Sequence, residues 1–100
     1  MPLHYVIITR TDDTPDSALA PYLANVGATL EPYQGRLLAF GQPQRLEGTG
    51  KLTRTAILEF PSEEASRGWY ESAAYQELAA WRIETMGGPV EFNLVSGMAA

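Results

Sequence analysis

The amino-acid sequence predicts an α+β fold with its elements in the order β-α-β-β-α-β. Short segments rich in β-branched and aromatic residues alternate with stretches whose apolar residues recur at helical spacing. The length of 100 residues suits a single domain with one core. We therefore expect one domain over residues 1–100, with its core between about residues 4 and 96.

The first half is expected to contain a strand, a helix and a second strand. Residues 4–10, "HYVIITR", are mostly β-branched or aromatic and precede the turn-rich "TDDTPD", which indicates a strand. Pro21 lies within the following helical pattern, so this helix either begins near Ala20 or begins near Ser17 and bends. "RLLAFG", residues 36–41, is the second predicted strand. The apolar stripe of the helix consists of Leu19, Tyr22, Leu23, Val26 and Leu30.

The second half repeats this order after a turn-rich segment at 42–53, in which residues 45–47 are candidates for extending the second strand. "RTAILEF", residues 54–60, predicts the third strand. Ser62 then caps a helix, and "PVEFNLV", residues 89–95, alternates as a fourth strand. The order is that of the ferredoxin-like unit, a four-stranded antiparallel sheet with two helices on one face.

The predicted strands carry apolar residues toward both faces of the sheet, although two helices cover only one face. A sheet that is apolar on both faces needs cover on both. The rest of the chain is too short to supply a second layer, so we expect a homodimer packed sheet against sheet. The residues of alternating orientation are Tyr5 and Ile7 against Val6 and Ile8, Leu38 and Phe40 against Leu37 and Ala39, and Ala56 and Leu58 against Ile57.

Composition excludes several classes of function. The net charge is −5 and the seven basic residues are scattered, so the basic patch of a nucleic-acid binder is missing. There is no cysteine and one histidine, so we expect no metal site, and no cofactor motif is present. No apolar run approaches the roughly 20 residues that span a membrane, and no basic segment precedes the first apolar run. These features predict a cytoplasmic protein.

The second helix is interrupted just after its two largest residues, in "EFPSEEASRGWYESAAYQ" at 59–76. Gly68 weakens the helix and leaves space for a close neighbour. Ser72 is suited to cap a second helical segment. Trp69 and Tyr70 point roughly 100° apart on a helix, so they would line two walls of the resulting corner. We therefore expect a cleft at this break.

Glu59 follows apolar residues in a strand expected to be central, where an unpaired carboxylate is costly to bury. Two interpretations are open. Glu59 forms an ion pair with Arg36 or Arg82, or its pKa rises and it acts as a general base. Of the two, the ion pair is the more frequent explanation for a carboxylate in a buried strand.

Other candidate residues also have a structural and a functional interpretation. Arg82 either closes the end of its helix or anchors a substrate carboxylate or enolate. Trp69, Tyr70 and Tyr75 belong either to the core or an interface, or to a wall that stacks against a ligand. His4 is an interface residue or, with Glu59, a candidate for moving a proton.

The segment "ILEFPSEEASRGWYESAAYQELAAWR", residues 57–82, resembles the signature of domain of unknown function 1330, a branch of the dimeric α/β-barrel proteins. The resemblance covers residues 4 to 96, and its other marks are Tyr5, Gly35-Arg36, Glu47-Gly48 and Arg54. The chain departs from the family at Gln34, where a glycine is frequent. The resemblance implies a ferredoxin-like fold and a sheet-to-sheet dimer, but no established activity; the wider superfamily includes cofactor-free monooxygenases and isomerases.

Two classes of function follow from these observations. The first is a dimeric module that binds a small molecule in the cleft between sheet and helices. The second is a cofactor-free enzyme, a proton-shuttling isomerase or an oxygenase, for a small anionic or aromatic substrate. In the enzyme, Glu59 or His4 would move the proton, Arg82 and Arg36 are the candidate anion-binding residues, and the aromatic residues would exclude water. The sequence does not identify the substrate.

Overall fold

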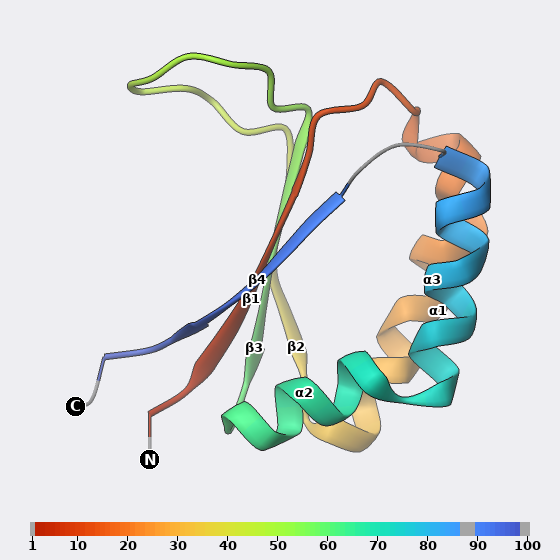
Figure 1. Ribbon diagram of the computed structural model, residues 1–100, viewed down its shortest axis with the longest axis vertical. Helices are drawn as coiled ribbons and strands as arrows, with labels where there is room; N and C mark the ends of the chain where they lie inside the picture. Colours follow the sequence, from red (N-terminus) through yellow and green to blue (C-terminus); the bar gives the residue numbers. More distant parts are fainter. Residues whose placement is uncertain (1, 87–89, 99–100) are drawn as a thin grey trace.

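The computed structural model describes residues 2–86 and 90–98 and has the predicted α+β ferredoxin-like fold. The strands are β1 (His4–Arg10), β2 (Arg36–Gly41), β3 (Arg54–Phe60) and β4 (Val90–Ser96). The helices are α1 (Ala20–Leu30), α2 (Glu63–Glu71) and α3 (Ala73–Met86), with short 3₁₀ turns η1 (Asp16–Leu19) and η2 (Glu31–Tyr33). The strands form one antiparallel sheet in the order β2-β3-β1-β4. The helices lie on one side of this sheet, with α1 and α3 side by side (Figure 1).

The element boundaries resolve the alternatives that the sequence left open. The first helix begins late, at Ala20, so that Pro21 falls in its first turn, where the missing N–H removes no helical hydrogen bond. Residues 45–47 do not extend β2, which ends at Gly41, so that expectation was wrong. The predicted start of the fourth strand at residue 89 lies outside the described residues, and β4 continues one residue further than expected, to Ser96.

The core lies between the helices and one face of the sheet, and aromatic rings fill its centre. Phe60, Trp69 and Tyr75 are fully buried. The Trp69 ring centroid lies 4.2 Å from that of Tyr75 and 5.5 Å from that of Phe60. The Trp69 indole donates a hydrogen bond to the Thr29 hydroxyl of α1 at 3.0 Å, so its one polar atom is satisfied inside the core. This cluster joins α1, α2, α3 and β3.

The predicted helix break lies at Ser72, whose backbone leaves the helical region at φ −64° and ψ 147°. Its hydroxyl donates to the Trp69 carbonyl at 2.7 Å and accepts from the Tyr75 N–H at 3.2 Å, so one side chain closes α2 and caps α3. Gly68 admits a close neighbour as expected, because a Cβ at this position would lie 3.0 Å from the Tyr33 ring. The break turns α3 away from α2 and alongside α1 (Figure 1).

None of the described helices lies over the other face of the sheet (Figure 1). Leu58 and Phe60 of β3 are buried beneath the helices, and Ile57, which precedes Leu58, has the opposite orientation. Ile57 pairs directly with Ile7 of β1, and both are only partly buried. No helix among the described residues is both long and apolar enough to cross a membrane.

Candidate functional site

A pocket of about 410 Å³ lies between α2 and the adjoining strands β1 and β4. This volume falls within the range of small-molecule sites in proteins. Its walls combine aliphatic, aromatic, polar and charged groups. The lining residues are Val6, Ser66, Arg67, Tyr70, Glu71, Phe92, Asn93 and Leu94.

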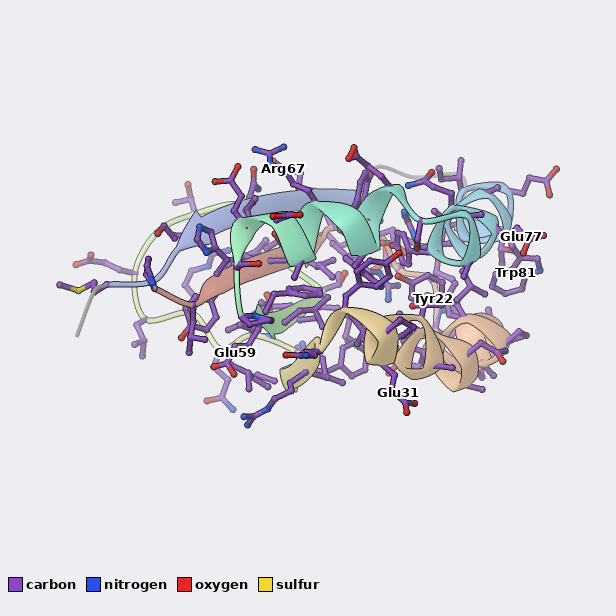
Figure 2. All side chains as sticks on the ribbon, turned by 90° about the horizontal axis from the view of Figure 1, so that it is seen from below. Tyr22, Glu31, Glu59, Arg67, Glu77 and Trp81 are labelled. Carbon is purple, nitrogen blue, oxygen red and sulfur yellow. The ribbon has the colours of Figure 1, made fainter. Side chains whose placement is uncertain are left out.

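The helical wall consists of two pairs spaced four residues apart, Ser66 with Tyr70 and Arg67 with Glu71, which share neighbouring faces of α2. The buried Ser66 hydroxyl donates to the Glu63 carbonyl at 2.7 Å. Arg67 Nε donates to the Glu63 carboxylate at 2.7 Å, and this bond is the main reason that the pKa of Glu63 is lowered. Arg67 projects outward from the helix, so it lies at the rim of the pocket (Figure 2).

The strand wall follows from the alternation of β4. Phe92 and Leu94 are two residues apart and lie on the helix-facing side of the sheet, opposite Ile8 and Val6 of β1. The alternation predicted for residues 89–95 also places Phe92 and Leu94 on one face. Their role as a wall depends on where α2 crosses the sheet, which strand alternation does not indicate.

Tyr70 forms the aromatic part of the pocket and is 43% exposed. Its ring centroid lies 5.7 Å from those of Phe92 and Tyr75. Trp69, its neighbour in sequence, is buried in the core and does not line the pocket. The structure thus separates the two residues expected at the cleft, with Tyr70 on its wall and Trp69 behind it.

Tyr75 and Arg82 lie deeper, between the pocket and α1. The Tyr75 hydroxyl is 2.8 Å from the Tyr22 hydroxyl, and burial raises the pKa of both phenols. The Arg82 guanidinium carbon lies 5.2 Å from the centroid of the Phe92 ring and 5.8 Å from that of Tyr22, within range of cation–π attraction. Figure 2 shows Tyr22 reaching from α1 into the interior of the helical layer.

The remaining candidates lie outside the pocket. Glu59 is 3.5 Å from Arg36, so of its two proposed partners the structure brings Arg36 beside it. Both have the strand orientation that faces away from the helices, since Glu59 lies between the buried Leu58 and Phe60. His4 Nε2 is 3.9 Å from the Glu63 carboxylate, and its Nδ1 is buried with no hydrogen-bond partner among the described residues. Neither Glu59 nor His4 lines the pocket.

Sequence reasoning did not select Ser66, Arg67 or Glu71 as site residues. Their i, i+4 spacing was available, but a solvent-facing helix surface has the same spacing. No group of three or more His, Asp or Glu side chains in residues 2–86 and 90–98 is arranged to hold a metal ion.

Solved structures confirm the fold over nearly the whole chain. A protein of unknown function from Rhodopseudomonas palustris is 19% identical, with 99% of this chain and 84% of that one aligned at a TM-score of 0.67. A "dimeric ferredoxin-like protein of unknown function" from Jannaschia sp. is 11% identical, with 93% and 97% aligned at 0.70. A "putative antibiotic biosynthesis monooxygenase" from Caulobacter crescentus is also 11% identical, with 98% and 92% aligned at 0.68. At these identities the likeness shows the fold alone.

No protein with a curated description matches the chain. A family model does match, over residues 4–98, which is nearly the whole sequence and includes the pocket and the helix break. The chain therefore belongs to the family described as Domain of unknown function (DUF1330).

Proposed function

We propose that this protein binds a small molecule in the pocket between α2, β1 and β4. The observation that carries the proposal is a 410 Å³ hollow beside the partly exposed Tyr70 ring, with apolar walls at Val6, Phe92 and Leu94. Binding sites for small molecules usually combine such apolar walls with a few polar groups that fix orientation. Two charged residues of the helical wall, Arg67 and Glu71, supply those groups.

The same proposal includes a homodimer in which a second copy covers the helix-free face of the sheet. Tyr5, Ile7 and Ile57 lie at the centre of this face, and Val95 is 50% exposed beside them. Apolar groups in one contiguous area favour association. The Jannaschia neighbour is described as dimeric, which supports a dimer.

A cofactor-free enzyme is the alternative, and the fold of the Caulobacter neighbour is compatible with it. The residues first considered for proton transfer give it little support, since Glu59 pairs with Arg36 and His4 lies beside Glu63. An enzyme in this pocket would instead depend on Glu71 or Tyr70, which line it. We therefore prefer the binding function.

The experiment is a screen of small aromatic and aliphatic compounds by two-dimensional NMR of the protein labelled with ¹⁵N. We expect binding compounds to shift the amide signals of Tyr70, Phe92 and Leu94 together. Leu94→Trp fills the pocket and should abolish these shifts, because a large ring then occupies the ligand volume.

Leu46→Trp is the matched control, since Leu46 is 99% exposed on the loop between β2 and β3. This variant should bind as the wild type does. The proposal fails if no compound shifts the pocket signals, or if the Leu94→Trp protein, shown to be folded by its spectrum, binds as well as the Leu46→Trp protein.

A further inference from the structure

Arg82 is a buried cation without a counter-ion in the described part of the chain. Arg82 lies on α3, and 8% of its surface is exposed to solvent. No carboxylate of residues 2–86 and 90–98 lies within 4.0 Å of its guanidinium, and its Nε has no hydrogen-bond partner there. A guanidinium stays charged even when buried. The rings of Tyr22 and Phe92 attract it, but this offsets only part of the cost of removing an ion from water.

The hydroxyl pair beside Arg82 adds a further donor. When two hydroxyls bond to each other, one hydrogen is used and the hydrogen of the accepting group stays available. Tyr22 and Tyr75 form such a pair at 2.8 Å, so one of their two hydroxyl hydrogens is not used between them. Burial keeps both phenols neutral by raising their pKa, and Arg82 is near enough to oppose that rise in both. The cluster therefore offers several donors and no negative charge.

This cluster adjoins the pocket. Phe92 lies under the Arg82 guanidinium and also lines the pocket. Tyr70 lines the pocket too, and its ring packs against the rings of both Tyr75 and Phe92. Tyr70 is 43% exposed whereas Tyr75 is fully buried, so Tyr70 is the less confined of these two rings.

We infer that the ligand of this pocket is a small carboxylate, whose anionic end binds Arg82 and the free tyrosine hydroxyl while its apolar body lies against Phe92 and Leu94. The planar guanidinium matches a carboxylate with two parallel hydrogen bonds. Rotation of Tyr70 admits the carboxylate to Arg82. The inference rests on the pocket proposed above and adds the chemical class of its ligand.

The test compares phenylacetate with its neutral counterpart phenylacetamide at pH 7, by calorimetry and by NMR. The two probes share one apolar body and differ in charge. We expect phenylacetate to bind at least about ten-fold more tightly, as one good charged hydrogen-bonded contact implies. We also expect the arginine Nε–H signal of Arg82 to move on addition of phenylacetate and to stay in place with phenylacetamide.

Arg82→Met should remove the preference for phenylacetate, whereas Arg45→Met should retain it. Arg45 is exposed on the loop between β2 and β3, so it provides the same substitution away from the pocket. Arg67→Met tests the competing cation at the pocket rim. Should Arg82→Met fail to fold, the Nε–H signal of the wild-type protein decides the question.

Three results would overturn the inference. Equal binding of the two probes, abolished by Leu94→Trp, would leave the binding pocket in place but remove its anionic specificity. If Arg67→Met loses the preference for phenylacetate and Arg82→Met keeps it, the carboxylate binds Arg67 at the pocket rim. Failure of both probes to bind at millimolar concentration would reject the carboxylate, while the wider compound screen still decides the pocket itself.

Discussion

At the scale of single residues, Gly35 shows how one hydrogen atom in place of a side chain determines packing. A Cβ at this position would lie 2.6 Å from Phe60 Cε1 and 2.9 Å from Leu30 Cδ2. Both contacts are shorter than atoms tolerate, and Phe60 is fully buried, so it has little room to move. Glycine therefore allows the start of β2 to lie directly on the aromatic core.

We predict that Gly35→Ala destabilises the protein by about 1–3 kcal/mol, the usual cost of overpacking a core. Urea denaturation followed by circular dichroism measures it. Gly27→Ala is the matched control, because a Cβ there meets no atom of residues 2–86 and 90–98 within 4 Å and Gly27 lies inside α1. The control should gain up to about 1 kcal/mol from helix propensity. Similar effects at the two glycines would contradict the packing argument.

Asp12 is held by a buried partner just after β1. Arg10, 6% exposed, donates from Nε and Nη2 to the two Asp12 carboxylate oxygens, both at 3.0 Å. The Thr14 N–H donates to the same carboxylate at 3.0 Å. These bonds, the Arg10 side chain first among them, hold the pKa of Asp12 well below its usual value.

We predict that Asp12→Asn lowers the free energy of unfolding by about 2–3 kcal/mol at pH 7, as expected for hydrogen bonds to charged groups. The unfolded chain protonates Asp12 near its ordinary pKa of about 4, whereas the folded chain does not. The stabilisation is therefore present above that pH and lost as the pH falls below it, so wild type and variant should converge in acid.

Denaturant melts between pH 7 and pH 2.5 check this pH dependence. Asp13→Asn serves as the control, because Asp13 pairs with Lys51 at an exposed site and such pairs contribute little. A constant difference between wild type and Asp12→Asn across this range would show that the carboxylate charge is not responsible.

At the scale of elements, one serine sets the angle between α2 and α3. We predict that Ser72→Ala costs about 1 kcal/mol, because the Tyr75 N–H loses its acceptor and the Trp69 carbonyl loses a donor. Ser72→Thr should recover part of the loss, since threonine also caps helices. Ser96→Ala, at an exposed serine of β4, should be close to neutral in the same urea melts. Equal losses in both alanine variants would refute the capping role.

The sequence predicted these elements well where the signal was local. These local signals act through the nearest few residues, and each agrees with the structure. They are the composition of the strands, the helix caps at Ser62 and Ser72, and the position of Pro21. Residues 45–47 were less predictable, because nothing in a short segment says whether a neighbouring strand is there to pair with it.

The site was less predictable than the fold because it depends on contacts between distant segments. Tyr70 lines the pocket beside the helix break, but the opposite wall belongs to β4, more than twenty residues later. The partner of Glu59 follows from the pairing of β2 with β3, which contains an irregularity between Leu37 and Ala39. Strand register of this kind is a tertiary property.

At the scale of the whole molecule, the helix-free face of the sheet predicts the assembly. We expect the wild-type protein to scatter light as a particle of twice the 10.9 kDa chain mass. Ile57→Lys places a charge at the centre of this face, so it should give monomers because an unpaired charge would be buried between the sheets.

Ile83→Lys is the control for this prediction. Ile83 is 58% exposed on α3, on the other side of the molecule from the proposed contact, so this variant should remain dimeric. A wild-type mass near 10.9 kDa, or dissociation in both lysine variants, would refute a sheet-to-sheet dimer.

The pairing of β1 with β4 also determines how the molecule responds to mechanical force. The two strands run antiparallel from His4 opposite Ser96, and the Gly97 N–H donates to the Leu3 carbonyl at 2.7 Å just outside them. The first residue of β1 and the last residue of β4 therefore lie at the same end of the sheet (Figure 1). Tension applied at the start of β1 and the end of β4 would therefore break the hydrogen bonds between these two strands one after another, starting from that end of the sheet. Phe92 and Leu94 of β4, which form the strand wall of the pocket, would therefore separate from β1 before the buried aromatic core opens.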